Sequence, residues 1–323
     1  MPKPDPYTNE AIASARQFEI DEPRFKLVDL HPTQGKNNRV LRGTFDGAPV
    51  VLKYYGDGFK SSTPSALRKL REITFLRHAH GTGFVPGLLA KTDRLVVMEL
   101  IEGEPLAIQL RRMGLRSATA ETALQIGAAH RTLSDLHLES AKILEIESAC
   151  FGGITLGERI ENLLEGAAGF SGRDLLGGVE KNSLEKIRDL SSVFLSEPRV
   201  LYRYDNNLGN VLVDTNGQLL SLVDFEQCFV GTPTLYLGAI FDCAHAVPWS
   251  KKTEPGIFQQ LPWEALAEGV GIDPSAGTMQ LIVVAAMVNH WIRILDVQEN
   301  HPDLTAWIPR LRPRFAAYLK ALD

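Results

Sequence analysis

The chain has 323 residues, of which 44% are hydrophobic and 23% are charged, and its formal net charge is −5 at pH 7. This length allows one large domain or two smaller ones, and the composition is ordinary for a globular protein without long disordered tracts. The mildly acidic balance argues against nonspecific nucleic-acid binding, which depends on clustered Lys and Arg, so we expect no nucleic-acid partner.

The N-terminal part of the chain is predicted to be rich in β-strands. Residues 40–45 and 49–55 are β-prone and flank an Asp-Gly turn, which is a strong hairpin signal. Residues 64–80 are predicted to form a helix, because apolar side chains recur there at helical spacing. Residues 94–101, rich in Leu, Val and Ile, predict a further strand.

Beyond residue 102 the chain is predicted to be mostly helical, with one β-hairpin. The hairpin consists of strands 211–213 and 219–223 around an Asn-Gly turn. We therefore predict an α+β, protein-kinase-like two-lobed fold, with a small β-rich lobe (1–101) and a larger helical lobe (102–323) that flank a ligand site. The helices expected in the second lobe are 119–138, 154–165, 182–195, 235–246, 263–269, 278–297 and 304–322.

Cysteine usage and hydropathy indicate a cytoplasmic location. Cys150, Cys228 and Cys243 include no Cys-x-x-Cys pair, so we interpret them as buried, reduced thiols. Residues 1–22 lack the apolar core of a signal peptide, and the longest apolar run, 281–288, is too short to span a bilayer. We expect no transmembrane segment, whereas peripheral membrane contact remains open.

Polar residues stand at the open end of the predicted hairpin. Pairing along its strands brings Asn210 opposite Val223 or Asp224, with Cβ atoms about 5 Å apart. Amide and carboxylate oxygens suit Mg²⁺, and Asp205, five residues before Asn210, is placed to accept a proton from an attacking hydroxyl. This combination predicts phosphoryl transfer. The alternative is structural, with Asp205 in an Asx turn and Asp224 capping the next element.

Two charged residues in the first part of the chain fit the same reaction. Lys53 ends the alternating strand before the predicted helix, where a lysine can hold the phosphates of a nucleotide. Glu72 lies on that helix and is a candidate partner for Lys53. The alternative is an exposed pair, which would contribute only about 0–1 kcal/mol to stability.

Further candidates for nucleotide contacts lie in two connecting segments. Residues 35–39 link the first two strands, and Gly35 with amides such as Asn38 would let backbone N–H groups approach phosphates. A plain polar turn is the alternative, because no G-x-G-x-x-G pattern is present. Residues Glu99 to Ile101 would supply the backbone groups that meet adenine.

Residues 205–214 and 223–226 resemble motifs of the aminoglycoside phosphotransferase and choline kinase branch of the protein-kinase-like superfamily, and the resemblance covers most of residues 27–245. Glu226, where protein kinases have glycine, favours the small-molecule branch. The resemblance implies ATP and Mg²⁺ as cofactors, with Asp205 as catalytic base. It also implies that Asn210 and Asp224 bind Mg²⁺, and that Lys53 with Glu72 orders the triphosphate.

The sequence departs from that family at four positions. Arg203-Tyr204 replaces the usual His-Gly before the catalytic Asp, and Asn207 replaces a His. Tyr236 stands where the family has an Asp that braces the catalytic loop, for which Arg203 is a candidate replacement. These departures keep a non-catalytic nucleotide-binding module as an alternative to an active enzyme.

The acceptor is expected to be a hydroxyl group of a small molecule or sugar. A kinase acting on a lipopolysaccharide core sugar or on a protein is the alternative within the same fold. An aromatic cage for a quaternary ammonium group would need tryptophans, but we interpret the four in this chain as packing residues: Trp249, Trp263, Trp291 and Trp307.

Overall fold

The computed structural model describes residues 6–34, 38–56, 64–151, 155–161, 181–244, 261–273 and 275–298. The chain divides into two compact units. The first comprises Met1–Glu102 together with Ser221–Glu226, and the second comprises Gly103–Leu220 and Gln227–Asp323. The sequence predicted a single boundary after residue 101 and did not predict that residues 221–226 return to the first unit.

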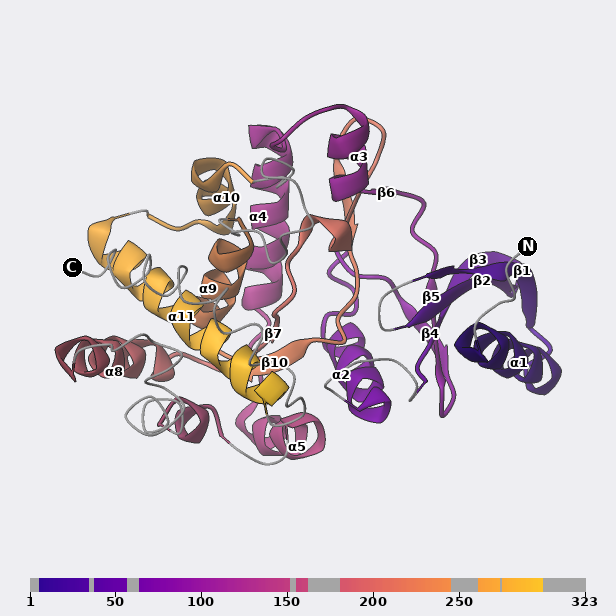
Figure 1. Cartoon of the computed structure of the whole chain (residues 1–323), viewed down its shortest axis with the longest axis horizontal. Helices are drawn as coiled ribbons and strands as arrows, with labels where there is room; N and C mark the ends of the chain where they lie inside the picture. Colours follow the sequence, from indigo (N-terminus) through magenta and orange to yellow (C-terminus); the bar gives the residue numbers. More distant parts are fainter. Residues whose placement is uncertain are drawn as a thin grey trace. The chain divides into compact units, whose positions relative to one another are not determined.

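The first unit contains a five-stranded antiparallel sheet in the order β1-β2-β3-β5-β4 (Figure 1). The predicted hairpin is confirmed, because Phe45 pairs with Ala48 across a turn in which Asp46 and Gly47 have φ values of 52° and 80°. Glycine adopts this left-handed backbone without strain. The strands are β1 (Phe25–Gln34), β2 (Arg39–Phe45), β3 (Ala48–Tyr54), β4 (Leu88–Lys91) and β5 (Leu95–Glu99).

Helix α1 (Pro6–Asp21) packs on one face of this sheet, and the sequence did not predict it. The buried residues of α1 recur at helical spacing, but most of them are small. The sequence of α1 therefore resembles that of an exposed polar segment. These buried residues join a core with alternate residues of the strands, which face one side of a pleated sheet. The α1 members of that core are Ala11, Ala15 and Phe18, and the members from β3 are Val50, Leu52 and Tyr54.

The predicted helix over 64–80 is confirmed as α2 (Ser65–His78). Residues 221–226 are attached to the first unit by hydrogen bonds and ring stacking. The backbone N–H of Leu222 donates to the carbonyl of Phe84 over 2.9 Å. The Phe225 ring stacks on Phe75 of α2, with centroids 4.3 Å apart and an interplanar angle of 11°. These contacts position Asp224, which lies between them in sequence.

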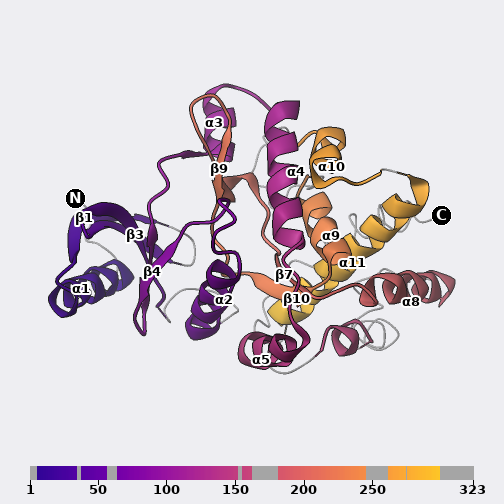
Figure 2. The ribbon, with the colours of Figure 1, turned by 180° about the vertical axis from the view of Figure 1, so that it is seen from behind.

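The second unit is mostly helical, as predicted, and Figure 2 shows its helices from behind. The predicted strands 211–213 and 219–223 correspond to β8 and β9, which form a sheet with β6 in the order β6-β8-β9. The bounds of the helices are α3 (Leu106–Arg112), α4 (Ala120–Ser134), α5 (Ser140–Phe151), α8 (Lys181–Leu195), α9 (Pro233–Ala244), α10 (Trp263–Val270) and α11 (Ala276–Gln298). Those of the strands are β6 (Glu104–Pro105), β7 (Val200–Arg203), β8 (Val211–Val213), β9 (Leu219–Leu222) and β10 (Cys228–Gly231).

Several of these elements were not predicted. Helices α3 and α5 were missed, and so was the antiparallel pair formed by β7 and β10. The helix predicted over 304–322 lies outside the described residues, and of the one predicted over 154–165 only 155–161 is described. Cys228 is buried and forms no disulfide, as expected, whereas the side chains of Cys150 and Cys243 lie outside the described set.

Glycines allow α4 and α10 to pack closely together. A Cβ atom on Gly127 would lie 2.3 Å from the Leu266 carbonyl oxygen, and one on Gly269 would lie 2.1 Å from the Leu124 carbonyl oxygen. Both separations are far below van der Waals contact, so a side chain at either position would push the helices apart. This packing supports α4, which carries His130.

The described helices include none that is long and apolar enough to cross a membrane. Among the tryptophans, the described Trp263 packs edge-on against Phe241, with ring centroids 4.9 Å apart. This contact agrees with the interpretation of Trp263 as a packing residue. The side chains of Trp249, Trp291 and Trp307 lie outside the described set.

Candidate active site

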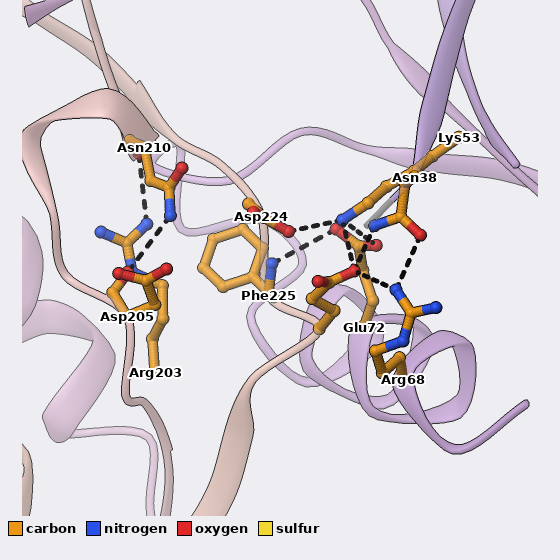
Figure 3. A network of polar contacts seen from close by, with 10 residues as sticks. Asn38, Lys53, Arg68, Glu72, Arg203, Asp205, Asn210, Asp224 and Phe225 are labelled. Carbon is orange, nitrogen blue, oxygen red and sulfur yellow. Dashed lines mark hydrogen bonds and ion pairs between the residues drawn. The ribbon is translucent and has the colours of Figure 1, made fainter. Parts of the chain in front are cut away.

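The candidate residues form two groups, one within each compact unit. In the first unit, Lys53 is the centre of a buried cluster of charges (Figure 3). Its ammonium nitrogen lies 2.5 Å from Asp224 Oδ1 and 2.9 Å from Glu72 Oε2. Burial alone would lower the pKa of Lys53, but the surrounding carboxylates outweigh this effect and raise it above its ordinary value. The lysine is therefore positively charged, as a phosphate ligand must be.

Glu72 links α2 to the backbone beside Asp224. One carboxylate oxygen pairs with Lys53, and the other, Oε1, accepts a hydrogen bond of 3.2 Å from the N–H of Phe225. Burial raises the pKa of Glu72 to about 7, even though Lys53 acts to lower it. The predicted Lys53–Glu72 pair is therefore present and buried rather than exposed.

Three further residues belong to this cluster. Glu226 Oε2 lies 3.4 Å from Lys53 Nζ and 3.3 Å from a guanidinium nitrogen of Arg68. The Asn38 side chain donates its amide N–H to Glu226 Oε2 and accepts a hydrogen bond of 2.9 Å from Arg68. No role in the site was predicted for Arg68 or Glu226. A usable signal existed, because Arg68 is one helical turn before Glu72 and Glu226 is two residues after Asp224.

The remaining nucleotide candidates of the first unit lie in β5 and the connecting segments. The Glu99 side chain accepts a hydrogen bond of 2.8 Å from the N–H of Gly87, and its own N–H donates to the Gly87 carbonyl. Ile101 follows β5 in irregular backbone and is partly buried. Gly35 lies outside the described residues. The roles of Glu99, Ile101 and Gly35 in binding nucleotide stay predictions.

In the second unit, Asp205 lies in the loop that joins β7 to the short 3-10 helix η1 (Leu208–Asn210). Its carboxylate Oδ1 accepts a hydrogen bond of 2.6 Å from the Asn207 side chain and one of 3.4 Å from the Asn207 backbone. Both of these bonds reach Oδ1, and Oδ2 accepts none within the described residues. The Asn210 amide donates to the Asp205 carbonyl over 3.4 Å.

Arg203 is hydrogen-bonded both to this loop and to the end of η1, and Figure 3 shows its bond to the Asn210 carbonyl. Its buried guanidinium donates to Asn206 Oδ1 over 3.0 Å and to the carbonyl of Asn210 over 3.2 Å. The Asn206 amide donates back to the Arg203 carbonyl over 2.9 Å. Arg203 therefore acts as a brace of the loop, in place of the Asp that the sequence lacks.

Tyr236, which stands at the position of that missing Asp, forms a neutral contact instead. Its hydroxyl lies 2.7 Å from Nδ1 of the buried His130. Burial lowers the pKa of His130 well below 6.5, and Arg203 lowers it further. Burial likewise raises the pKa of Tyr236, so both groups are uncharged at neutral pH.

We expect the substitution His130→Gln to make the protein less sensitive to mild acid. A histidine in the unfolded chain titrates at about pH 6.5. The folded protein resists protonation of His130, so the neutral His130 contributes its full share of stability above about pH 6.5. Below it, the free energy of unfolding falls by up to about 1.4 kcal/mol per pH unit until the folded pKa is reached. Urea unfolding of both proteins at several pH values between about 5 and 8 would measure this difference. Parallel pH profiles would contradict it.

The residues around Asp224 fit the chemistry of a hard cation. The Asp224 side chain is 37% exposed, and a positive φ of 66° sets the backbone that presents it. No cluster of three or more metal-binding side chains occurs in the part of the chain that the structure describes. A partly exposed carboxylate such as Asp224 could bind Mg²⁺, which proteins hold through one or two groups together with water and phosphate oxygens. Asn210 belongs to the other unit, so its pairing with Asp224 stays a prediction.

Comparison with known proteins gives the family. Residues 32–241 match the family model described as the phosphotransferase enzyme family, APH. By sequence, no curated protein matches the chain significantly.

Solved structures share the fold at low sequence identity. An ethanolamine kinase of Plasmodium vivax is 13% identical with a TM-score of 0.57, and the match covers 98% of this chain and 85% of that one. The ADP-bound aminoglycoside phosphotransferase APH(2'')-Ib is 14% identical with a TM-score of 0.56, covering 96% and 98%. A microcompartment-associated aminopropanol kinase is 15% identical with a TM-score of 0.55, covering 95% of both chains.

These similarities confirm the predicted α+β, protein-kinase-like fold. The family match extends over well more than half of the chain and includes both groups of candidate residues. The chain therefore belongs to the phosphotransferase enzyme family.

Proposed function

We propose that this protein transfers the γ-phosphoryl group of ATP to a hydroxyl group of a small molecule or sugar. The observation that carries the proposal is the buried, charged Lys53, held between Glu72 and Asp224. An isolated ion pair at this depth would cost desolvation energy without a compensating gain in stability. A site that receives phosphates explains why the chain maintains such a cluster.

Each candidate residue has a role in this reaction. Lys53, oriented by Glu72, binds phosphate oxygens of the nucleotide, and Asp224 with Asn210 holds Mg²⁺. The metal would neutralise charge on the phosphoryl oxygens. Asp205 accepts the proton of the acceptor hydroxyl through Oδ2, while Asn207 fixes Oδ1. The backbone around Gly35 and Asn38 would approach the phosphates, and that of Glu99 to Ile101 would contact adenine.

The names of the structural neighbours support a choice of first acceptors. Their names specify ethanolamine, aminopropanol and aminoglycosides, all small molecules that carry hydroxyl and amino groups. We therefore propose a small amino alcohol or amino sugar as the first acceptors to examine. The Arg203 brace supports an active enzyme over a non-catalytic module, because Arg203 fixes the segment around Asp205 at two points.

Nucleotide binding is the first test of this proposal. The thermal midpoint should rise when ATP and Mg²⁺ are present together, and much less with either alone, because a ligand that binds the native state stabilises it. Phosphate transfer from radiolabelled ATP to a panel of amino alcohols and amino sugars would then identify the acceptor. No midpoint shift at saturating nucleotide would contradict the proposal. Binding without transfer to any hydroxylated acceptor, including proteins and lipopolysaccharide, would indicate the non-catalytic module.

A further inference from the structure

A second buried ion pair adjoins the Lys53–Glu72 pair. Arg68 is 2% exposed and contacts Glu226, whose side chain is 4% exposed. Glu226 Oε2 is shared, since Arg68 approaches it to 3.3 Å and Lys53 to 3.4 Å. The Tyr55 ring faces both cations, with its centroid 5.4 Å from Lys53 Nζ and 5.6 Å from Arg68 Cζ. Arg68 and Lys53 therefore compete for one carboxylate oxygen.

The charges of this cluster determine how it can receive an anion. The described members include two cations, Lys53 and Arg68, against the carboxylates of Glu72, Asp224 and Glu226. With all five groups ionised the cluster has a formal charge of −1. Without Arg68, the formal charge of the cluster around Lys53 would be −2. Buried charges at such distances are weakly screened, so this difference is felt strongly by a bound nucleotide.

We propose that Arg68 is a positioning residue for nucleotide binding, which holds Glu226 so that Lys53 stays available to phosphate. Without Arg68, Glu226 has Lys53 as its remaining cationic partner in the cluster and competes with phosphate for the ammonium group. This inference rests on the proposed function, because it assumes that the ligand of Lys53 is the phosphate chain of a nucleotide.

Arg68 also connects this pair to the segment before β2. Its guanidinium donates to Asn38 Oδ1, while the Asn38 amide donates to Glu226. Both ends of the Asn38 side chain are thus engaged within the cluster. Arg68 and Glu226 therefore hold the Asn38 side chain between them.

A double-mutant cycle between Arg68 and Glu226 tests the proposal, with the Kd for Mg-ATP measured by titration calorimetry. Arg68→Met should raise the Kd about tenfold or more, because it leaves Glu226 charged beside Lys53. The double variant Arg68→Met/Glu226→Gln restores the charge of −1 and keeps an acceptor for Asn38. Its Kd should therefore return to within about threefold of that of the unaltered protein. In steady-state assays, Arg68→Met should raise KM for ATP with little change in kcat.

The matched control is Arg77→Met, which removes the same charge from an exposed site about 14 Å further along α2. It should leave the Kd unchanged. If Arg68→Met fails to fold, Glu226→Gln is compared with the double variant. The proposal requires removal of Arg68 from Glu226→Gln to raise the Kd for Mg-ATP by clearly less than tenfold, because only the charge of Arg68 itself is lost once Glu226 is neutral. A rise of tenfold or more would overturn it.

The outcomes separate this inference from the proposed function. If the unaltered protein does not bind Mg-ATP, both fall together. If it binds Mg-ATP and folded Arg68→Met binds it equally well, Arg68 is a structural residue only, and the proposed function stands. A loss in Arg68→Met that Glu226→Gln does not rescue would also overturn the inference, since it would reflect packing rather than charge.

Discussion

The substitution Asp205→Asn is expected to lower kcat about a hundredfold or more while leaving the Kd for Mg-ATP nearly unchanged. An amide of the same shape can keep the hydrogen bonds to Asn207 but cannot accept the proton of an acceptor hydroxyl. Removal of a general base typically costs a factor of about 10² to 10⁴. Single-turnover transfer to an identified acceptor, together with calorimetric titration of Mg-ATP, would measure both effects.

Asp214→Asn is a matched control for that experiment. Asp214 belongs to the same unit and stabilises the turn after β8, where its Oδ1 accepts hydrogen bonds from the N–H groups of Asn216 and Gln218. The amide oxygen of asparagine can accept the same bonds, so transfer should continue at nearly the rate of the unaltered protein. Unchanged kcat in Asp205→Asn would refute the role of Asp205 as base.

The second large effect is expected from Asp224→Asn, which should abolish the dependence of nucleotide binding on Mg²⁺. Asparagine is preferred to alanine here because it tolerates the positive φ of residue 224. For the unaltered protein, Mg-ATP at about a hundred times its Kd should raise the thermal midpoint by about 4 °C. In the variant, addition of Mg²⁺ to ATP should give no further rise.

The variant should also bind ATP in the absence of metal at least as well as the unaltered protein does. Asp224 lies 2.5 Å from Lys53, so its replacement removes a carboxylate that competes with phosphate for the ammonium group. Titration of ATP in the presence of EDTA would measure this. Weaker metal-free binding than in the unaltered protein would contradict this competition between Asp224 and phosphate. A midpoint rise that depends on Mg²⁺ as strongly as in the unaltered protein would exclude the Asp224 carboxylate as an essential ligand.

Much of the first unit could be predicted from local pattern. The Asp-Gly turn between β2 and β3 requires a left-handed backbone, which few residues accept, so it indicates a hairpin without reference to the rest of the chain. The apolar spacing of α2 likewise identifies a helix locally. Helix α1 was missed because its buried face consists largely of Thr8, Ala11 and Ala15, whose burial depends on the sheet beneath them.

The candidate site likewise has a part that local pattern predicts and a part that it does not. Lys53, Glu72, Asp205, Asn210 and Asp224 were named from residue type and order, because phosphoryl transfer needs a cation, a base and hard oxygen ligands in a recognisable sequence. Which side chains meet in the buried cluster could not be derived in this way. The separation between Asn38 and Glu226 is 188 residues along the chain, and their hydrogen bond forms only once β2 and residues 221–226 pack into one unit.

Local chemistry therefore established the family, the fold class and the candidate residues, because each of these depends on short-range pattern. Long-range packing alone established that Arg68 and Glu226 belong to the Lys53 cluster. Arg203, already a candidate brace in the sequence, meets the Asp205 loop through residues only three and seven positions away. The physical reason is that a charge or a polar group in a sequence has no defined environment. Burial against distant segments decides which partner it has and how strongly the two interact.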